Sequence, residues 1–211
     1  MPVFPLNVFA SGCAFGLSLI VAIGPQNAFV VRQGALRSHV MSVVAVCSIS
    51  DVVLIAAGVA GAGAALAGRP WLMQVARVAG AIVLLAYAVY AARRAWHPAG
   101  SGSGAETAPG RQDRAAVIAA CLAFTWLNPA VYLDTLVLLG SVAQGHAGRQ
   151  WWFGGGAALG SVFWFAALAA GAASAHSLLT RPAVWRGVDC FVAVIMTTTE
   201  VRLLLAAHAG V

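Results

Sequence analysis

The sequence has few charged residues and no lysine. Only 9% of its 211 residues are charged, whereas 61% are hydrophobic, and the mean hydropathy is +0.88. Soluble domains carry roughly 25% charged residues, so this chain has too little polar material to cover a soluble surface of its size. The composition predicts an all-α membrane protein that crosses the lipid bilayer several times. The net charge of +6 comes from arginines in short loops, where they set topology, so nucleic acid is not expected as a partner.

Cysteine motifs and enzyme motifs are absent from the sequence. The four cysteines are widely spaced in apolar stretches, and no CxxC or Cys/His spacing typical of a metal site is present. Neither a disulfide framework nor a metal ion nor another cofactor is therefore indicated. The chain also lacks a GxSxG, an HExxH and a Walker-type loop, so no motif predicts an enzyme.

Long apolar runs are what the sequence does contain. A membrane span needs roughly 20 apolar residues to cross the hydrocarbon core. Six segments qualify, at about 4–30, 40–66, 71–92, 115–143, 151–175 and 186–208. The stretch between the third and fourth segments is rich in Gly, Ser and Pro, as a flexible linker would be. We therefore predict a first three-helix repeat over 1–92, a cytoplasmic linker over 93–114 and a second three-helix repeat over 115–211.

Arginine placement predicts the orientation of these spans. Eight arginines fall in the odd-numbered connections and two in the even-numbered ones, and Arg32 and Arg37 are expected in the first connection. An excess of arginine in short loops marks the cytoplasmic side. We therefore expect the odd-numbered connections in the cytoplasm.

Two of the predicted spans are interrupted by a proline. The first contains "AIGPQNAF" with Gly24 and Pro25, and the fourth contains "WLNPAVYLD" with Pro129. The spans that follow them share the spacing S-x₇-A-A-G-x-A, from Ser48 and from Ser161. Three spans per half is an odd number, so the second half enters the membrane from the opposite side, as in the 3+3 inverted-topology repeats of secondary transporters. In such folds discontinuous helices meet near the midplane and line the substrate site. We therefore expect the Pro-broken helices 1 and 4 of this chain to do the same.

Two aspartates lie well inside predicted spans. Asp51 is in "SISDVVLIAAG" and Asp134 is in "NPAVYLDTLVLLG". A carboxylate at the centre of a membrane helix costs about 2.5–3.5 kcal/mol on insertion scales, and it marks a functional site by default. The alternative is a structural ion pair with an internal arginine, either Arg77 or Arg202.

Carboxamides and aromatic residues accompany the two prolines. Gln26 and Asn27 directly follow the first proline, Asn128 precedes the second, and Trp126 and Tyr132 flank it. Positive helix N-termini suit an α-carboxylate, and two aspartates suit cationic groups. The aromatic pair either closes over a guanidinium or ammonium group by cation–π contact or packs against neighbouring helices. The residues thus fit a zwitterion with a cationic side chain, or a substrate exchanged for protons as a carboxylate titrates.

Three motifs, "IGPQNAFVVRQG", "SISDVVLIAAGVAG" and "TWLNPAVYLDTLVLLGS", resemble the LysE family of amino-acid exporters, and especially its arginine/lysine branch. The resemblance covers about residues 4–175 and implies export of L-arginine, L-lysine or both from the bacterial cytoplasm, driven by the membrane potential or a proton gradient. The positions that match the family's signature are Gly24, Pro25, Gln26, Asn27, Asp51, Asn128, Pro129 and Asp134. The last span departs from the family, because Glu200 and Arg202 in "IMTTTEVRLLL" stand where an apolar stretch with a tryptophan is usual.

The resulting hypothesis is a six-span, multi-pass exporter of basic amino acids in the bacterial inner membrane. Asp51 and Asp134 would bind the cationic side chain or couple protons, and the carboxamides with the half-helix N-termini would hold the α-amino-acid end. Six helices in a chain this short are compatible with a homodimer. Two alternatives stay open: export of a neutral amino acid or a divalent cation, and a non-transporting membrane scaffold in which polar residues only fix helix register.

Overall fold

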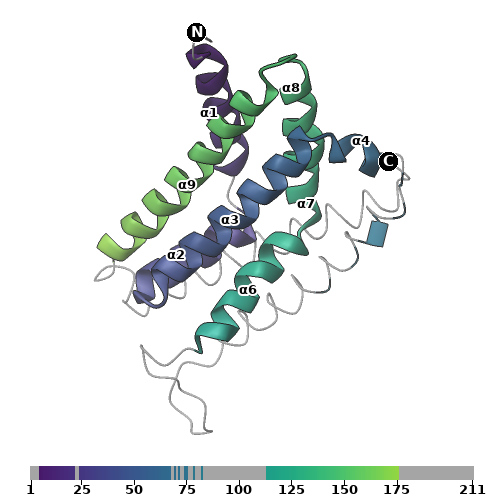
Figure 1. Cartoon of the computed structure of the whole chain (residues 1–211). Helices are drawn as coiled ribbons and strands as arrows, with labels where there is room; N and C mark the ends of the chain where they lie inside the picture. The colour runs from purple at the N-terminus through teal and green to yellow at the C-terminus, as the bar shows by residue number, and fades with distance from the viewer. Residues whose placement is uncertain are drawn as a thin grey trace, which may run out of the picture.

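Every regular element in the described part of the chain is a helix. This computed structural model describes residues 5–21, 24–67 and 113–175, with single positions between 69 and 82. The elements are α1 (Leu6–Ile20), α2 (Pro25–Leu36), α3 (Val40–Val59), α4 (Ala62–Ala67), α6 (Arg114–Trp126), α7 (Pro129–Tyr132), the π-helix η1 (Leu133–Leu139), α8 (Gly140–Gln144) and α9 (Gln150–Ser174) (Figure 1). The all-α prediction is confirmed for these residues.

Two of these helices, α3 and α9, are each long and apolar enough to cross a membrane. Two further candidates are bent pairs: α1 and α2 meet at 84°, and α6 meets the segment 130–144 at 59°. The described part thus contains two candidate spans, or up to four if each bent pair is one span. The third and sixth predicted spans, the linker, Glu200 and Arg202 lie wholly or mostly outside the described residues, so the 3+3 repeat stays a prediction.

The prediction that Arg32 lies in a loop is wrong. Pro25 occupies the first turn of α2, where its missing N–H costs nothing, and the helix then continues to Leu36. Arg32 is therefore helical and only 7% exposed. Arg37, which ends this helix in the left-handed conformation, donates hydrogen bonds from its guanidinium to the carbonyl of Ala173 in α9.

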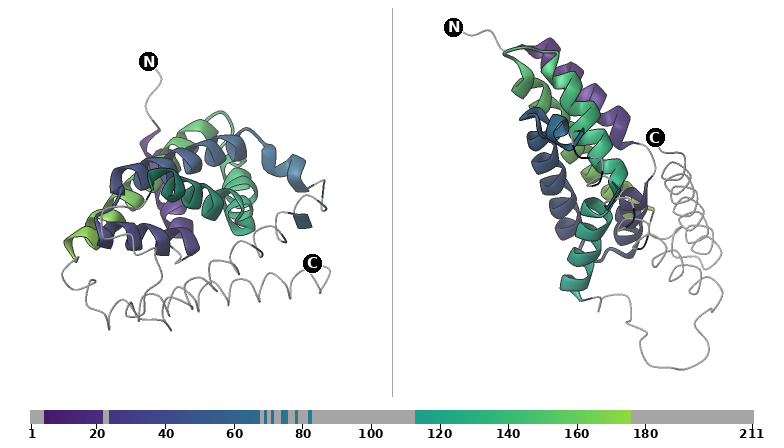
Figure 2. Two further views of the ribbon diagram at one scale, coloured as in Figure 1. Left: turned by 90° about the horizontal axis from the view of Figure 1, so that it is seen from below. Right: turned by 90° about the vertical axis from the view of Figure 1, so that its right-hand side faces the viewer.

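Helix α9 packs against α1, α2 and α3 and so joins the two halves of the sequence. Figure 2 shows the purple and blue helices of the first half interleaved with the green helices of the second. Glycines allow the closest approach: a Cβ added to Gly12 would lie 2.0 Å from the carbonyl oxygen of Phe153, and one added to Gly156 would lie 2.0 Å from that of Phe9. Such backbone contacts replace hydrophobic driving force between helices in lipid, and they hold α1 against α9.

Candidate binding cavity at the two bends

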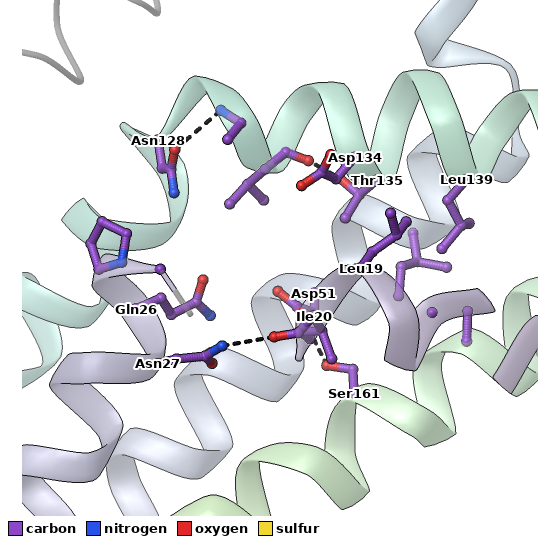
Figure 3. A pocket seen from close by; sticks show the side chains of 17 residues that line it. Leu19, Ile20, Gln26, Asn27, Asp51, Asn128, Asp134, Thr135, Leu139 and Ser161 are labelled. Atoms are coloured by element: carbon purple, nitrogen blue, oxygen red, sulfur yellow. Dashed lines mark hydrogen bonds between the residues drawn. The ribbon is translucent and has the colours of Figure 1, made fainter. Parts of the chain in front are cut away.

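A cavity of about 380 Å³ lies where the two bends face α3 and α9. Small-molecule sites have volumes of roughly 300–1,000 Å³, so this cavity is large enough for a metabolite. Its lining comes from α1, α2, α3, α7, η1, α9 and the residues that border the bends. The polar residues among them are Gln26, Asn27, Asp51, Asn128, Asp134, Thr135 and Ser161 (Figure 3).

The cavity brings together most of the residues that the sequence singled out. Those that line it are Gly24, Pro25, Gln26, Asn27, Asp51, Asn128 and Asp134. Pro129 is the first residue of α7, next to the lining residue Asn128. Trp126 and Tyr132 are not among the lining residues. The two flanking aromatics therefore stand beside the cavity rather than in its wall.

Asp51 is a buried carboxylate held by a serine from the other half of the sequence. It lies in α3 and is 4% exposed, and its Oδ2 accepts a hydrogen bond of 2.8 Å from the hydroxyl of Ser161 in α9. A buried ionisable group needs such partners because desolvation without them is costly. One carboxylate oxygen is thus fixed by the fold, while the side chain as a whole faces the cavity.

The two neighbouring carboxamides at the start of α2 are used differently. The Asn27 amide nitrogen donates to the carbonyl of Ile20, the last residue of α1, at 2.7 Å, and its oxygen accepts from the indole N–H of Trp164 in α9 at 3.3 Å. The Gln26 amide nitrogen is buried and has no hydrogen-bond partner among the described residues. Figure 3 shows the Gln26 amide directed into the cavity on the side of Asp51.

At the second bend, polar side chains bind the backbone that the bend exposes. The Asn128 side-chain oxygen accepts from the backbone N–H of Ala130, as an N-cap residue does. The Tyr132 hydroxyl donates to the carbonyl of Trp126 at the end of α6. The Thr135 hydroxyl donates to the carbonyl of Val131 at 2.6 Å. The bonds of Asn128 and Tyr132 satisfy backbone groups at the two helix ends, whereas that of Thr135 is an i−4 bond within the helical run.

Trp126 connects the second bend to the helix that carries Asp51. Its indole N–H donates to the hydroxyl of Ser50 at 3.2 Å, and the residue is 37% exposed. Trp126 and Tyr132 therefore link the end of α6 to α7 and to α3. This arrangement favours the packing alternative for the two aromatics over a cation–π lid.

Asp134 lies in the π-helix η1, which is packed closely against α3. π-helical turns are rare and frequently occur at functional sites. A Cβ added to Gly58 of α3 would lie 2.3 Å from the carbonyl oxygen of Thr135, and one added to Gly140 would lie 2.7 Å from that of Gly58. This contact sets the separation between η1 and α3, and hence between the helices that carry the two aspartates.

Sequence reasoning missed Ser161 and Thr135 as polar cavity residues. The repeat spacing pairs Ser161 with Ser48, so it pointed to a structural equivalent and not to the contact with Asp51. The described residues contain no group of three or more His, Cys, Asp or Glu side chains arranged for a metal ion. Arg77 and Arg202, the alternative partners for the aspartates, lie outside the described residues.

Comparisons with known proteins all point the same way. The LysE type translocator family model matches residues 17–207. The chain is 42% identical to the arginine exporter protein ArgO of Yersinia enterocolitica over 192 residues, covering 90% of this chain and 93% of that one. It is 35% identical to the lysine exporter LysE of Corynebacterium diphtheriae over 227 residues, covering 95% and 100%. A putative amino-acid transporter of Mycobacterium tuberculosis is 45% identical over 194 residues, covering 90% and 94%. No solved structure matches the chain.

Proposed function

The chain belongs to the LysE family of translocators, which are transporters and not enzymes, and we propose that it exports arginine, lysine or both from the cytoplasm across the bacterial inner membrane. The observation that carries this proposal is the cavity in which a carboxylate from α3 and one from η1 meet carboxamides from both bends. The names of the arginine-exporting and lysine-exporting relatives support the substrate class. The driving force is the membrane potential or a proton gradient, and the working unit is compatible with a homodimer.

The cationic end of the substrate binds between Asp51 and Asp134. A carboxylate paired with a guanidinium or ammonium forms charge-assisted hydrogen bonds about twice as strong as neutral ones. Ser161 holds one oxygen of Asp51, which orients the carboxylate before the substrate arrives. In the described part of the chain, no hydrogen bond or ion pair engages the carboxylate of Asp134, so it is open to a cation.

The α-amino-acid end binds at the start of α2. The buried amide nitrogen of Gln26 has no hydrogen-bond partner among the described residues. The positive N-terminus of the 12-residue helix α2 lies at the same wall of the cavity. The side-chain nitrogen of Asn128 can add a second donor, because only its oxygen caps α7. Together these groups suit a carboxylate, so the cavity matches a zwitterion with a positive side chain.

Export of a neutral amino acid, export of a divalent cation and a non-transporting scaffold are the competing proposals. A neutral amino acid leaves two carboxylates facing apolar atoms, which is costly. A divalent ion prefers several oxygen ligands, and the described residues offer no clustered third acidic or histidine ligand. A scaffold gives no role to an open cavity of this volume.

The test compares Asp51→Asn and Asp134→Asn with the parent in cells fed an arginine-containing or a lysine-containing dipeptide, at matched abundance in the membrane. Loss of a hydrogen bond to a charged group costs about 1.5–3 kcal/mol, so we expect arginine release to fall about ten- to hundredfold. The matched control is Asp113→Asn, because Asp113 is an exposed N-cap of α6 and Asn caps a helix equally well.

Three outcomes separate the proposals. Loss of release in both cavity variants, with Asp113→Asn unaffected, supports an arginine exporter that uses both carboxylates. A parent that releases neither arginine nor lysine refutes the basic-amino-acid proposal and directs the search to neutral amino acids and divalent ions. Variants that disappear from the membrane while the parent moves no substrate support a structural role for the aspartates.

A further inference from the structure

The first bend is held by a three-residue chain of hydrogen bonds that we call the Asn27 latch: Trp164 of α9, Asn27 of α2 and Ile20 of α1. Trp164 donates to the oxygen of Asn27 at 3.3 Å, and the nitrogen of Asn27 donates to the carbonyl of Ile20 at 2.7 Å. Asn27 is 7% exposed. We propose that the latch sets the relative position of α1 and α2, and that Asn27 and Trp164 are positioning residues for transport rather than substrate ligands.

The chemistry of the amide supports this division of roles. The amide nitrogen and oxygen of Asn27 already form hydrogen bonds with other protein groups. The amide nitrogen of its neighbour Gln26 has no hydrogen-bond partner among the described residues. A substrate that bound the Asn27 amide would have to compete with a backbone carbonyl at the end of a helix. Leaving that carbonyl unsatisfied is unfavourable, because a buried acceptor then loses its hydrogen bond without regaining water. No backbone carbonyl depends on the Gln26 nitrogen in this way, so substrate bound there leaves no such carbonyl open.

The place of the latch explains why it would affect transport. The cavity wall includes Leu19 and Ile20 from the end of α1 and Gly24 and Pro25 from the start of α2, and these two helices meet at 84°. A change in that angle moves one part of the wall relative to the other. Because Trp164 belongs to α9, which also carries Ser161, the latch ties the angle to the helix that orients Asp51.

A cysteine introduced into the cavity wall can report the position of the wall without any substrate. A Cβ added to Gly24 would meet no atom within 4 Å, and Gly24 has an extended backbone with φ −119° and ψ 178°, so Gly24→Cys fits without strain. The experiment uses Gly24→Cys in the full chain with the four native cysteines replaced by alanine, and follows the rate of labelling by a membrane-permeant maleimide. This readout needs no knowledge of the substrate.

We expect Asn27→Ala and Trp164→Phe each to change the labelling rate about three- to tenfold, the effect of one hydrogen bond. The double variant should change it no more than the larger single variant, because both act on one chain of bonds. Trp151→Phe is the control, since Trp151 is on the same helix but 58% exposed. Labelling rates equal to the parent in both latch variants, or strictly additive effects, overturn the proposal.

The effect of the latch on export rests on the proposed function and is measured separately. In vesicles loaded with arginine, Asn27→Ala and Trp164→Phe should lower the maximal rate about three- to tenfold with little change in KM, whereas Gln26→Ala should raise KM. If Asn27→Ala raises KM as Gln26→Ala does and leaves labelling unchanged, Asn27 is a substrate ligand and the latch is refuted. If the parent exports no basic amino acid, the proposed function fails, and the labelling rates still decide whether the latch exists.

Discussion

Gly58→Ala is the substitution that most directly tests how the second aspartate is placed. The added Cβ would lie 2.3 Å from the carbonyl oxygen of Thr135 and 3.1 Å from the Cα of Leu136. An ordinary contact between such atoms is about 3.5 Å, so α3 and η1 would have to separate by about 1 Å. Asp134 is carried on η1 and would move with it.

The expected size of the effect follows from that displacement. Overpacking of a close contact costs about 1–3 kcal/mol, and a misplacement of about 1 Å in a binding group can cost about a hundredfold in rate. We therefore expect Gly58→Ala to lower arginine release at least about tenfold while the protein still reaches the membrane. The assay is release from dipeptide-fed cells, together with thermal unfolding in detergent.

Gly171→Ala is a matched control for this experiment. Gly171 occupies the position equivalent to Gly58 in the predicted repeat, S-x₇-A-A-G-x-A, but a Cβ there would meet no atom within 4 Å. It should export and unfold like the parent. Equal losses in the two variants would show a general intolerance to methyl groups, and parent-like export by Gly58→Ala would refute the claim that this contact positions Asp134.

Two further predictions concern the packing around α9. Ser161→Ala removes the donor to Asp51 Oδ2 and should lower arginine release about tenfold or more. Its control, Ser174→Ala, removes an exposed hydroxyl of the same helix and should release arginine like the parent. Equal rates in the two variants would argue that Ser161 does not orient Asp51. Gly156→Ala should lower the melting temperature in detergent, because its Cβ would lie 2.0 Å from a backbone oxygen of α1. The control is Gly155→Ala, whose Cβ would meet only an aromatic carbon at 3.7 Å. Similar melting temperatures of both variants would contradict the close approach of α1 and α9.

The sequence located the cavity better than it assigned the roles within it. Proline and glycine in an apolar run, followed by carboxamides, predicted where polar groups gather. Polar groups are costly in hydrocarbon, so those that are present mark a functional site by default. Asp51, Asp134 and Gln26 do line one cavity in the structure. Periodicity carries no information on which side chains face each other across helices, so the contact between Asp51 and Ser161, 110 residues apart, could not be predicted.

The details of the helices were also beyond the sequence. Nothing in "LDTLVLL" distinguishes a π-helix from an α-helix, since the difference is a shift of one residue in the hydrogen-bond pattern. In the same way, only the assembled fold shows that Gly156 packs against the backbone of α1 while the neighbouring Gly155 does not. Arg32 was misplaced for a related reason: a proline was read as an interruption within one span, although it also starts a helix that runs to Leu36.

The few polar residues in the apolar segments fall into two groups, according to what their side chains contact. One group satisfies backbone atoms that the bends expose, since each such atom left open in hydrocarbon would cost several kcal/mol. This group consists of Asn27, Asn128 and Tyr132. The other group lines the cavity without serving a backbone atom: the carboxylates of Asp51 and Asp134 and the amide of Gln26. Two carboxylates and one neutral donor are the groups on which the proposed recognition of a cationic amino acid rests.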